Sequence, residues 1–194
     1  MKWKFAVPAF LAAAIVAACG DDQTVSEGIA EKEAQSEQQE QKMPTVTQGQ
    51  TDDIKGLVAN YSSNKTTEEK ASITSQQLIV MDADANETVY TLPENEFFVS
   101  IAPFINETHP CKDHSLTGCQ GELVGKEIDV LIENGNGEVI VDETMTTMQN
   151  GFIDLWLPRD EAYVIELSHN GKKVSGDLTT FEEDGTCVTT LQLI

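Results

Sequence analysis

Two histidines and two cysteines lie within the fifteen residues from His109 to Leu123, in a chain of 194 residues that holds four cysteines and three histidines in all. Their order along the chain is His109, Cys111, His114 and Cys119. Thiolate and imidazole groups bind soft and borderline metal ions, whereas calcium and magnesium prefer oxygen ligands. The stretch therefore predicts a soft-metal site, with copper as the favoured ion.

Apart from Cys19, close to the amino terminus, the chain has one more cysteine, Cys187. Without Cys19, three thiols remain: Cys111, Cys119 and Cys187. Three explanations of this odd number stay open. In the first, two cysteines form a structural disulfide and one is left over. In the second, the cluster is a structural zinc site, although seven residues separate Cys111 from Cys119 where closely spaced pairs are usual. In the third, three thiolates hold Cu(I) in a trigonal arrangement and a nearby histidine supplements them.

Other residues that could do chemistry have simpler explanations. His169 stands beside the turn residues Asn170-Gly171 and is expected to be solvated. Met145 and Met148 are expected to pack, because a separation of three places them on opposite faces of a strand. Trp156 should lie on the face opposite the apolar set around it. The sequence contains no nucleophile elbow, no phosphate-binding glycine loop and no carboxylate pair with catalytic spacing.

The residues that must position the cluster follow a two-residue period of apolar side chains. This period, with Gly and Asn turns between the segments, predicts an antiparallel β-sandwich over residues 76–194. In the last strand, alternation places Cys187 on the same face as Thr189, Leu191 and Leu193, so its side chain should point to the core. The strands are expected at residues 78–81, 88–92, 97–104, 128–132, 138–144, 153–157, 163–167, 174–178 and 187–193.

A small helical segment is expected at residues 51–75, which makes the chain α+β overall. Thr51, Asp52 and Asp53 offer capping side chains before an apolar stripe at helical spacing, and residues 66–73 begin with a pattern that resembles a capping box. Helices this short are not stable alone. Their apolar stripes must pack on the β portion or on a second copy of the protein, so a homodimer is one hypothesis.

The amino terminus predicts export. Residues 1–18 have two lysines followed by an apolar run that is shorter than a membrane-spanning helix requires, which is typical of a signal peptide. Small residues directly before Cys19 resemble a lipobox, in which that cysteine carries a lipid anchor. Residues 19–50, rich in Glu, Gln and Ser, read as a disordered tether. The expected location is the cell envelope, as a membrane-anchored lipoprotein or a periplasmic protein, where thiols meet oxidising conditions.

The charge balance excludes one class of partner. The chain has 12 basic and 33 acidic residues, and loss of residues 1–18 would remove two lysines and no acid, which lowers the net charge from −21 to −23. Such a protein repels phosphate backbones and anionic lipid head groups. Nucleic acid is therefore not expected as a partner.

Six blocks of residues form a more specific pattern than any one motif. They are Phe98-Val-Ser-Ile-Ala-Pro-Phe104, Thr108-His-Pro-Cys111, His114, Cys119-Gln-Gly-Glu-Leu123, Gly151-Phe-Ile-Asp-Leu-Trp-Leu-Pro-Arg-Asp160 and Thr186-Cys-Val-Thr-Thr-Leu-Gln-Leu193. Together they resemble the CueP family of bacterial periplasmic copper-binding proteins, from about residue 76 to the end of the chain. The resemblance implies copper binding through Cys111, Cys119 and Cys187 with histidines alongside, and an N-terminal segment used for dimerisation.

Three functions follow from these observations. The leading hypothesis is a protein that holds Cu(I), with zinc as a substitute ion, for copper tolerance, sequestration or delivery to an exported cuproenzyme. The second is an enzyme that uses the same cysteines to reduce Cu(II), Fe(III) or disulfides, because a cysteine pair can give two electrons. The third is a surface-anchored β-sandwich interaction module with a structural disulfide. Whether the protein is an enzyme stays open.

Overall fold

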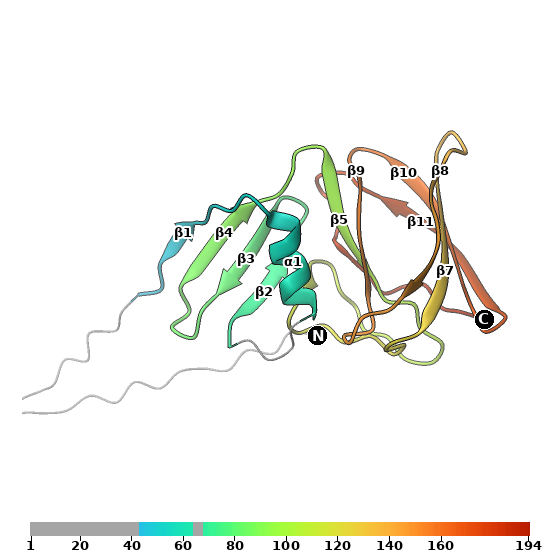
Figure 1. The fold of residues 1–194 in the computed structure, drawn as a ribbon, viewed down its shortest axis with the longest axis horizontal. Coiled ribbons are helices and arrows are strands. Elements are labelled where there is room, and N and C mark those ends of the chain that lie inside the picture. Colours follow the sequence, from blue (N-terminus) through green and yellow to red (C-terminus); the bar gives the residue numbers. More distant parts are fainter. Residues whose placement is uncertain (1–42, 64–67) are drawn as a thin grey trace, which may run out of the picture. The chain divides into compact units, whose positions relative to one another are not determined.

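The computed structural model describes residues 43–63 and 68–194, and within them the chain is mainly β with one short helix, as the sequence predicts (Figure 1). The expected signal segment, Cys19 and most of the expected tether lie outside the described residues. No helix among the described residues is long and apolar enough to cross a membrane. The elements are β1 (Val46–Gln48), α1 (Ile54–Ser63), β2 (Lys70–Ile73), β3 (Gln77–Met81), β4 (Glu87–Thr91), β5 (Glu96–Ile101), β6 (His114–Ser115), β7 (Glu127–Asn134), β8 (Val139–Thr146), β9 (Ile153–Pro158), β10 (Ala162–His169), β11 (Lys172–Thr179) and β12 (Cys187–Val188).

Two sheets pack face to face and form the predicted sandwich. One has the strand order β11-β10-β7-β8 and the other has the order β12-β5-β9. Asn170 and Gly171, which join β10 to β11, both have positive φ angles, as a tight two-residue hairpin turn requires. The side chains between the sheets form the main apolar core: Phe97, Val99, Ile101, Leu123, Ile128, Val130, Ile132, Ile153, Leu155, Leu157, Tyr163, Ile165, Leu167, Leu178, Leu191 and Leu193.

The three-stranded sheet β12-β5-β9 uses its two faces differently. Alternate residues of β5 and β9 point into the sandwich core, as their membership of that cluster shows. On the other face, called the outer face here, Ser100 of β5 lies in register with Asp154 of β9 on one side and with Cys187 of β12 on the other. Because directly paired residues project to the same side of a sheet, these three form a polar row.

A second layer, made of α1 and the sheet β1-β4-β3-β2-β6, covers this outer face. Phe98 of β5 belongs to its apolar cluster, and the ring of Trp156 stands edge-on to Phe98 with centroids 5.2 Å apart. Trp156 therefore lies opposite the sandwich core, as expected. The apolar stripe of α1 packs on this cluster within the chain, and dimerisation through the N-terminal segment stays a prediction. The buried members of the cluster are Val58, Tyr61, Ala71, Ile73, Leu78, Val80, Leu92, Phe98 and Leu116.

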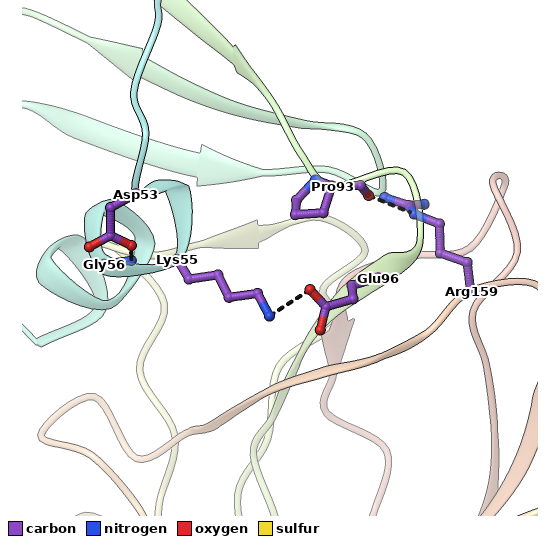
Figure 2. A network of polar contacts seen from close by, with 6 residues as sticks. All are labelled: Asp53, Lys55, Gly56, Pro93, Glu96 and Arg159. Atoms are coloured by element: carbon purple, nitrogen blue, oxygen red, sulfur yellow. Dashed lines mark hydrogen bonds and ion pairs between the residues drawn. The ribbon is translucent and has the colours of Figure 1, made fainter.

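Polar contacts fix α1 and the start of β5, as Figure 2 shows. Asp53 caps the helix, because its Oδ1 accepts a hydrogen bond of 2.8 Å from a backbone N–H in the first turn. Lys55 on the helix forms an ion pair of 2.5 Å with Glu96 of β5. Arg159, just after β9, donates from Nε to the carbonyl oxygen of Pro93 at 3.2 Å. The ion pair between Lys55 and Glu96 joins the helix to β5, whose neighbour β12 carries Cys187.

Two predictions for the N-terminal part are wrong. The second helix expected at residues 66–73 is not formed, since Lys70–Ile73 is strand β2, paired with β3 and β6. Its burial alternates with a period of two, and pairing on both sides outweighs a local capping signal. The tether expected at residues 19–50 ends earlier than predicted, because Val46–Gln48 forms β1 and pairs with β4. Residues 64–67 lie outside the described part of the chain.

The prediction for the last strand is also wrong in one respect. Strand β12 ends at Val188, although burial keeps alternating with a period of two to residue 193. Cys187 does not share a face with Leu191 and Leu193. Its buried side chain packs with Ala102 on the outer face, whereas the two leucines and Val188 pack with the sandwich core. The thiol therefore lies between the sandwich, which contributes Ala102, and the second layer, which contributes His114.

Candidate metal centre

Four side chains bring a metal-ligating atom to one place. The Sγ atoms of Cys111, Cys119 and Cys187 and a ring nitrogen of His114 all lie within 4.8 Å of one another. All three thiols are free. Since Cys187 lies on β12, far along the chain from the other three ligands, this arrangement exists only in the folded domain.

The individual distances suit a shared metal ion. The Sγ atoms of Cys111 and Cys119 are 3.7 Å apart, and the Sγ of Cys187 is 3.5 Å from Nδ1 of His114. Two thiolates bound tetrahedrally at about 2.3 Å from one ion stand roughly 3.8 Å apart. A disulfide bond is roughly 2.05 Å long. The two sulfur atoms are thus spaced as ligands of one ion, in the reduced state.

Hydrogen bonds hold the segment that carries Cys111 and His114 against β12. The backbone N–H of Cys187 donates to the carbonyl of Lys112 at 3.0 Å. The hydroxyl of Thr186 accepts a bond of 2.9 Å from the backbone N–H of His114 and donates to the carbonyl of Ile73 at 2.6 Å. Thr186 is fully buried. The Thr186 hydroxyl therefore connects the end of β2 with β6 at the start of β12. It also fixes His114 relative to Cys187.

A close backbone contact places the segment after Cys119. The N–H of Gly121 donates to the carbonyl of Asn150 at 2.7 Å. A Cβ on Gly121 would lie 2.7 Å from the carbonyl oxygen of Gly151, and a Cβ on Gly151 would lie 2.6 Å from that of Gly121. Only glycine fits at both positions. The loop that carries Cys119 therefore rests directly on the turn before Phe152.

The carboxylate of Glu122 fixes the segment that precedes His109. It accepts hydrogen bonds from the backbone N–H groups of Asn106, at 2.9 Å, and Ile105, at 2.6 Å. These bonds lower the pKa of Glu122 to about 2, because they favour the ionised carboxylate. Glu122 thus acts as an anchor for the loop rather than as a metal ligand.

The inner wall of the centre is apolar. The ring of His114 is fully buried and lies 4.4 Å, centroid to centroid, from the ring of Phe152. Ala102 and Phe152 pack with Cys187, and Met148 packs against this cluster from the side. Nδ1 of His114 lies near the Cys187 thiol, while its Nε2 is buried with no hydrogen-bond partner among the described residues. An orphaned buried polar atom is costly, and such costs are typical of functional sites.

The thiols differ in how readily they ionise. Hydrogen bonds from Cys187, His114 and His109 lower the pKa of Cys119 to about 2. The hydrogen bond to Cys119, together with burial, raises the pKa of Cys187, and burial raises that of Cys111. Their mutual hydrogen bonds thus favour the thiolate form of Cys119 over those of Cys111 and Cys187. A bound soft cation would displace the remaining thiol protons.

Four of the five ligands expected from the sequence converge, and the fifth lies beside them. His109 is half-buried, with its ring edge toward Phe152 at a centroid distance of 6.4 Å. Its side chain contributes to the lowered pKa of Cys119. It is not among the side chains whose ligand atoms lie within 4.8 Å of one another. His109 thus lies outside the converging group, and its role as a ligand stays a prediction.

The structure also shows the surroundings of His169, Met145 and Met148, which were not expected to bind metal. His169 lies at the end of β10, where its Nδ1 is 2.7 Å from the carbonyl oxygen of Glu127. Met145 and Met148 are both half-buried, as packing predicts, but the opposite-face argument fails because β8 ends at Thr146. Met148 lies beyond the strand, and both methionines border the same groove.

Three residues on or near the centre were not predicted as site residues. Phe152, Asp154 and Thr186 stand in two of the blocks that resemble the family, but nothing in those blocks marks a role for them. Asp154 pairs with Ser100 of β5, whereas Phe152 directly precedes β9 and Thr186 directly precedes β12. Their places depend on strand pairing between segments far apart in the chain.

The fold and the donor atoms define a mainly β protein with a thiol-rich centre suited to a soft metal. The chain belongs to the CueP family, because the family model described as periplasmic copper-binding protein CueP matches residues 54–192. A crystal structure described as S.CueP is similar to it, with 36% sequence identity, a TM-score of 0.69, and coverage of 73% of this chain and 88% of that one. No curated protein matches the chain. The resemblance to the CueP family is confirmed, and the family is one of periplasmic copper-binding proteins.

Proposed function

We propose that this protein holds one Cu(I) ion on Cys111, Cys119 and Cys187, with His114 as a further donor. The observation that carries the proposal is the convergence of these four ligand atoms within 4.8 Å. Family membership supports copper as the metal. Thiolate ligands select Cu(I), and three of them suit its preference for few ligands.

Zinc is the substitute ion to expect. Three cysteines and one histidine are also a zinc ligand set. Copper ranks above zinc in affinity for a given set of ligands, and soft thiolates favour the monovalent ion further. The apolar wall of Ala102 and Phe152 also favours a centre without bound water. Zinc should therefore bind, and Cu(I) should displace it.

The exposure of the ligands supports exchange with a partner. Cys187 and His114 are buried, while Cys111 and Cys119 are half-exposed. A recipient with its own soft ligands can approach the two outer thiols while the inner pair still holds the ion. This suits sequestration with release to an exported cuproenzyme, in the periplasm or, if Cys19 carries a lipid, at a membrane surface.

The test is an oxygen-free titration of reduced protein with Cu(I) against a competing chelator. We expect one tightly held ion per chain. Cys111→Ser, Cys119→Ser and Cys187→Ser should each weaken binding by more than the roughly 10–100-fold that loss of an outer-shell partner costs. Cys19→Ser is the matched control, and it should bind as the parent does. Equal affinity in all three site variants would place the copper elsewhere.

A reductase function is the second candidate, favoured by the 3.7 Å separation of Cys111 and Cys119. In this reaction the two thiols would lose two protons and two electrons and form a disulfide, while two Cu(II) ions each gain one electron. Added to metal-free reduced protein, Cu(II) should then yield two Cu(I) ions for each disulfide formed. Cys111→Ser should abolish this stoichiometry. Unchanged reduction in that variant would exclude the pair as the electron source.

A further inference from the structure

A separate groove of about 520 Å³ lies beside β9, the edge strand of the three-stranded sheet, and α1 and β8 also border it. Lys55 of α1 borders it, together with Met145 of β8, Met148 of the following turn, and Asp154 and Trp156 of β9. None of these residues is among the converging ligands of the thiol centre. The groove thus brings two thioethers, a carboxylate and an indole ring to one place.

Two methionines, which carry soft thioether donors, border this groove. Met148 borders the groove and also packs against the cluster that contains Cys187 and Phe152, so it stands between the groove and the thiol centre. Met145 borders the same groove from β8. A thioether is a polarisable ligand that favours Cu(I), and it needs no deprotonation.

Asp154 supplies a negative charge beside these neutral donors. Its carboxylate accepts hydrogen bonds from the hydroxyls of Ser62, at 2.5 Å, and Ser100, at 2.6 Å, both uncharged. The cation that borders the groove, Lys55, forms its ion pair with Glu96 instead, as Figure 2 shows. Burial raises the pKa of Asp154, while the two hydroxyls and the nearby His114 act in the opposite direction. A cation in the groove would offset the cost of that charge.

Trp156 gives the groove a surface that tolerates positive charge. The ammonium group of Lys55 lies 5.4 Å from the centroid of the indole ring, within the range of a cation–π contact. The same ring borders the groove. A metal ion bound there would therefore lie close to the indole, where it can quench tryptophan fluorescence.

We propose that Met145 and Met148, with Asp154 as the counter-charge, form a second and weaker Cu(I) site in this groove. The site goes beyond the thiol centre and can be tested with that centre disabled. It is weaker because thioethers carry no charge and a carboxylate is a hard ligand. The full-length protein would then hold one ion tightly on thiolates and a second one loosely on thioethers.

The experiment uses fluorescence of full-length protein with Trp3→Phe, which leaves Trp156 as the single tryptophan of the two in the chain. Cys111→Ser, Cys119→Ser and Cys187→Ser are combined in this background to disable the thiol centre. Titration with Cu(I) under nitrogen should quench the fluorescence and saturate at one ion per chain.

Methionine-to-leucine changes remove the sulfur donor but nearly conserve side-chain volume, so they distinguish metal binding from packing. Met145→Leu and Met148→Leu together should abolish the quenching, and Asp154→Asn should weaken it about tenfold, which equals about 1.4 kcal/mol. Met81→Leu, on β3, is the matched control and should have no effect. Absence of quenching in the folded parent, or quenching that survives loss of both methionines, would overturn the proposal.

If the three-serine variant does not fold, a second measurement tests the groove site. With all thiols intact, a Cu(I) titration should show a second, weaker equivalent, which Met145→Leu removes while the tight equivalent stays. A single equivalent in the parent would overturn the groove site and leave the thiol centre intact. Retention of the tight equivalent in the cysteine variants would overturn the thiol centre and leave the groove site standing.

Discussion

The two faces of the sheet β12-β5-β9 have opposite characters although they are built from alternate residues of the same strands. Phe97 and Val99 point into the sandwich core, where their neighbours are apolar. On the outer face, Ser100 lies in register with Asp154 and Cys187. One face supplies stability through buried apolar area, and the other holds polar and sulfur groups that the second layer shields from water.

This difference explains why the metal centre can be both buried and rich in donor atoms. Donor groups within a sandwich core would have to be paired or would weaken the packing. Between two layers they can be enclosed by a thin wall, here Phe152 and Ala102, without interrupting the main core. Changes on the two faces should therefore have separable effects, on folding and on metal affinity respectively.

The largest effect on folding should come from the core face. Phe97 is fully buried among the core residues, so Phe97→Ala should lower the free energy of unfolding by about 3–5 kcal/mol. The Cu(I) affinity of the molecules that remain folded should be unchanged, because Phe97 points away from the thiols. Urea unfolding and a Cu(I) competition titration on the same variant measure the two quantities. If Cu(I) affinity fell as much as it does on loss of a ligand, the effects of the two faces would not be separable.

A smaller effect on folding, joined to an effect on affinity, is expected at Thr186. Thr186→Val leaves the N–H of His114 and the carbonyl of Ile73 without their shared partner, at a cost of about 1–3 kcal/mol. Since Thr186 positions His114, Cu(I) affinity should also fall, by roughly 10–100-fold. Thr186→Ser keeps the hydroxyl and should restore both. If the valine variant lost stability but kept full affinity, Thr186 would be structural only.

The sequence predicted most of the fold because its signals there are local. The alternation along β7, β9 and β10 and the turn at Asn170-Gly171 need no knowledge of distant partners. Lys70–Ile73 was misassigned as helix because its strand character comes from pairing with β3 and β6. The face of Cys187 was misassigned because nothing local marks the end of β12 at Val188.

The candidate metal centre also has a part that the sequence predicted and a part that it did not. The three cysteines and His114 are recognisable by type and by their density in the chain, and the structure brings them together. Phe152 and Asp154 reach the outer face through the register of β9 against β5, which the sequence does not display. Donor atoms were therefore predictable, whereas the wall and the charges around them required the fold.

The smallest effect on stability should appear at Glu122 and depend on pH. Its pKa is lowered in the folded protein from 4.5 to about 2, so its stabilising contribution is complete above about pH 4.5 and is lost as the pH falls toward 2. Glu122→Gln should thus be less stable than the parent at pH 7, and the difference should vanish near pH 2. Urea unfolding of metal-free reduced protein across this range measures it. A difference that grows on acidification would contradict the role of the carboxylate.

The most direct test of the account compares two neighbouring residues of β12 that point to opposite faces. Cys187→Ser and Val188→Ala are titrated with Cu(I) against a chelator, in reduced protein without oxygen. Val188 packs on the sandwich core, so its truncation should cost about 1–2 kcal/mol of stability and leave the affinity unchanged. Cys187→Ser should weaken Cu(I) binding by more than about 100-fold with little loss of stability. Equal affinities in the two variants would contradict a metal centre on the outer face.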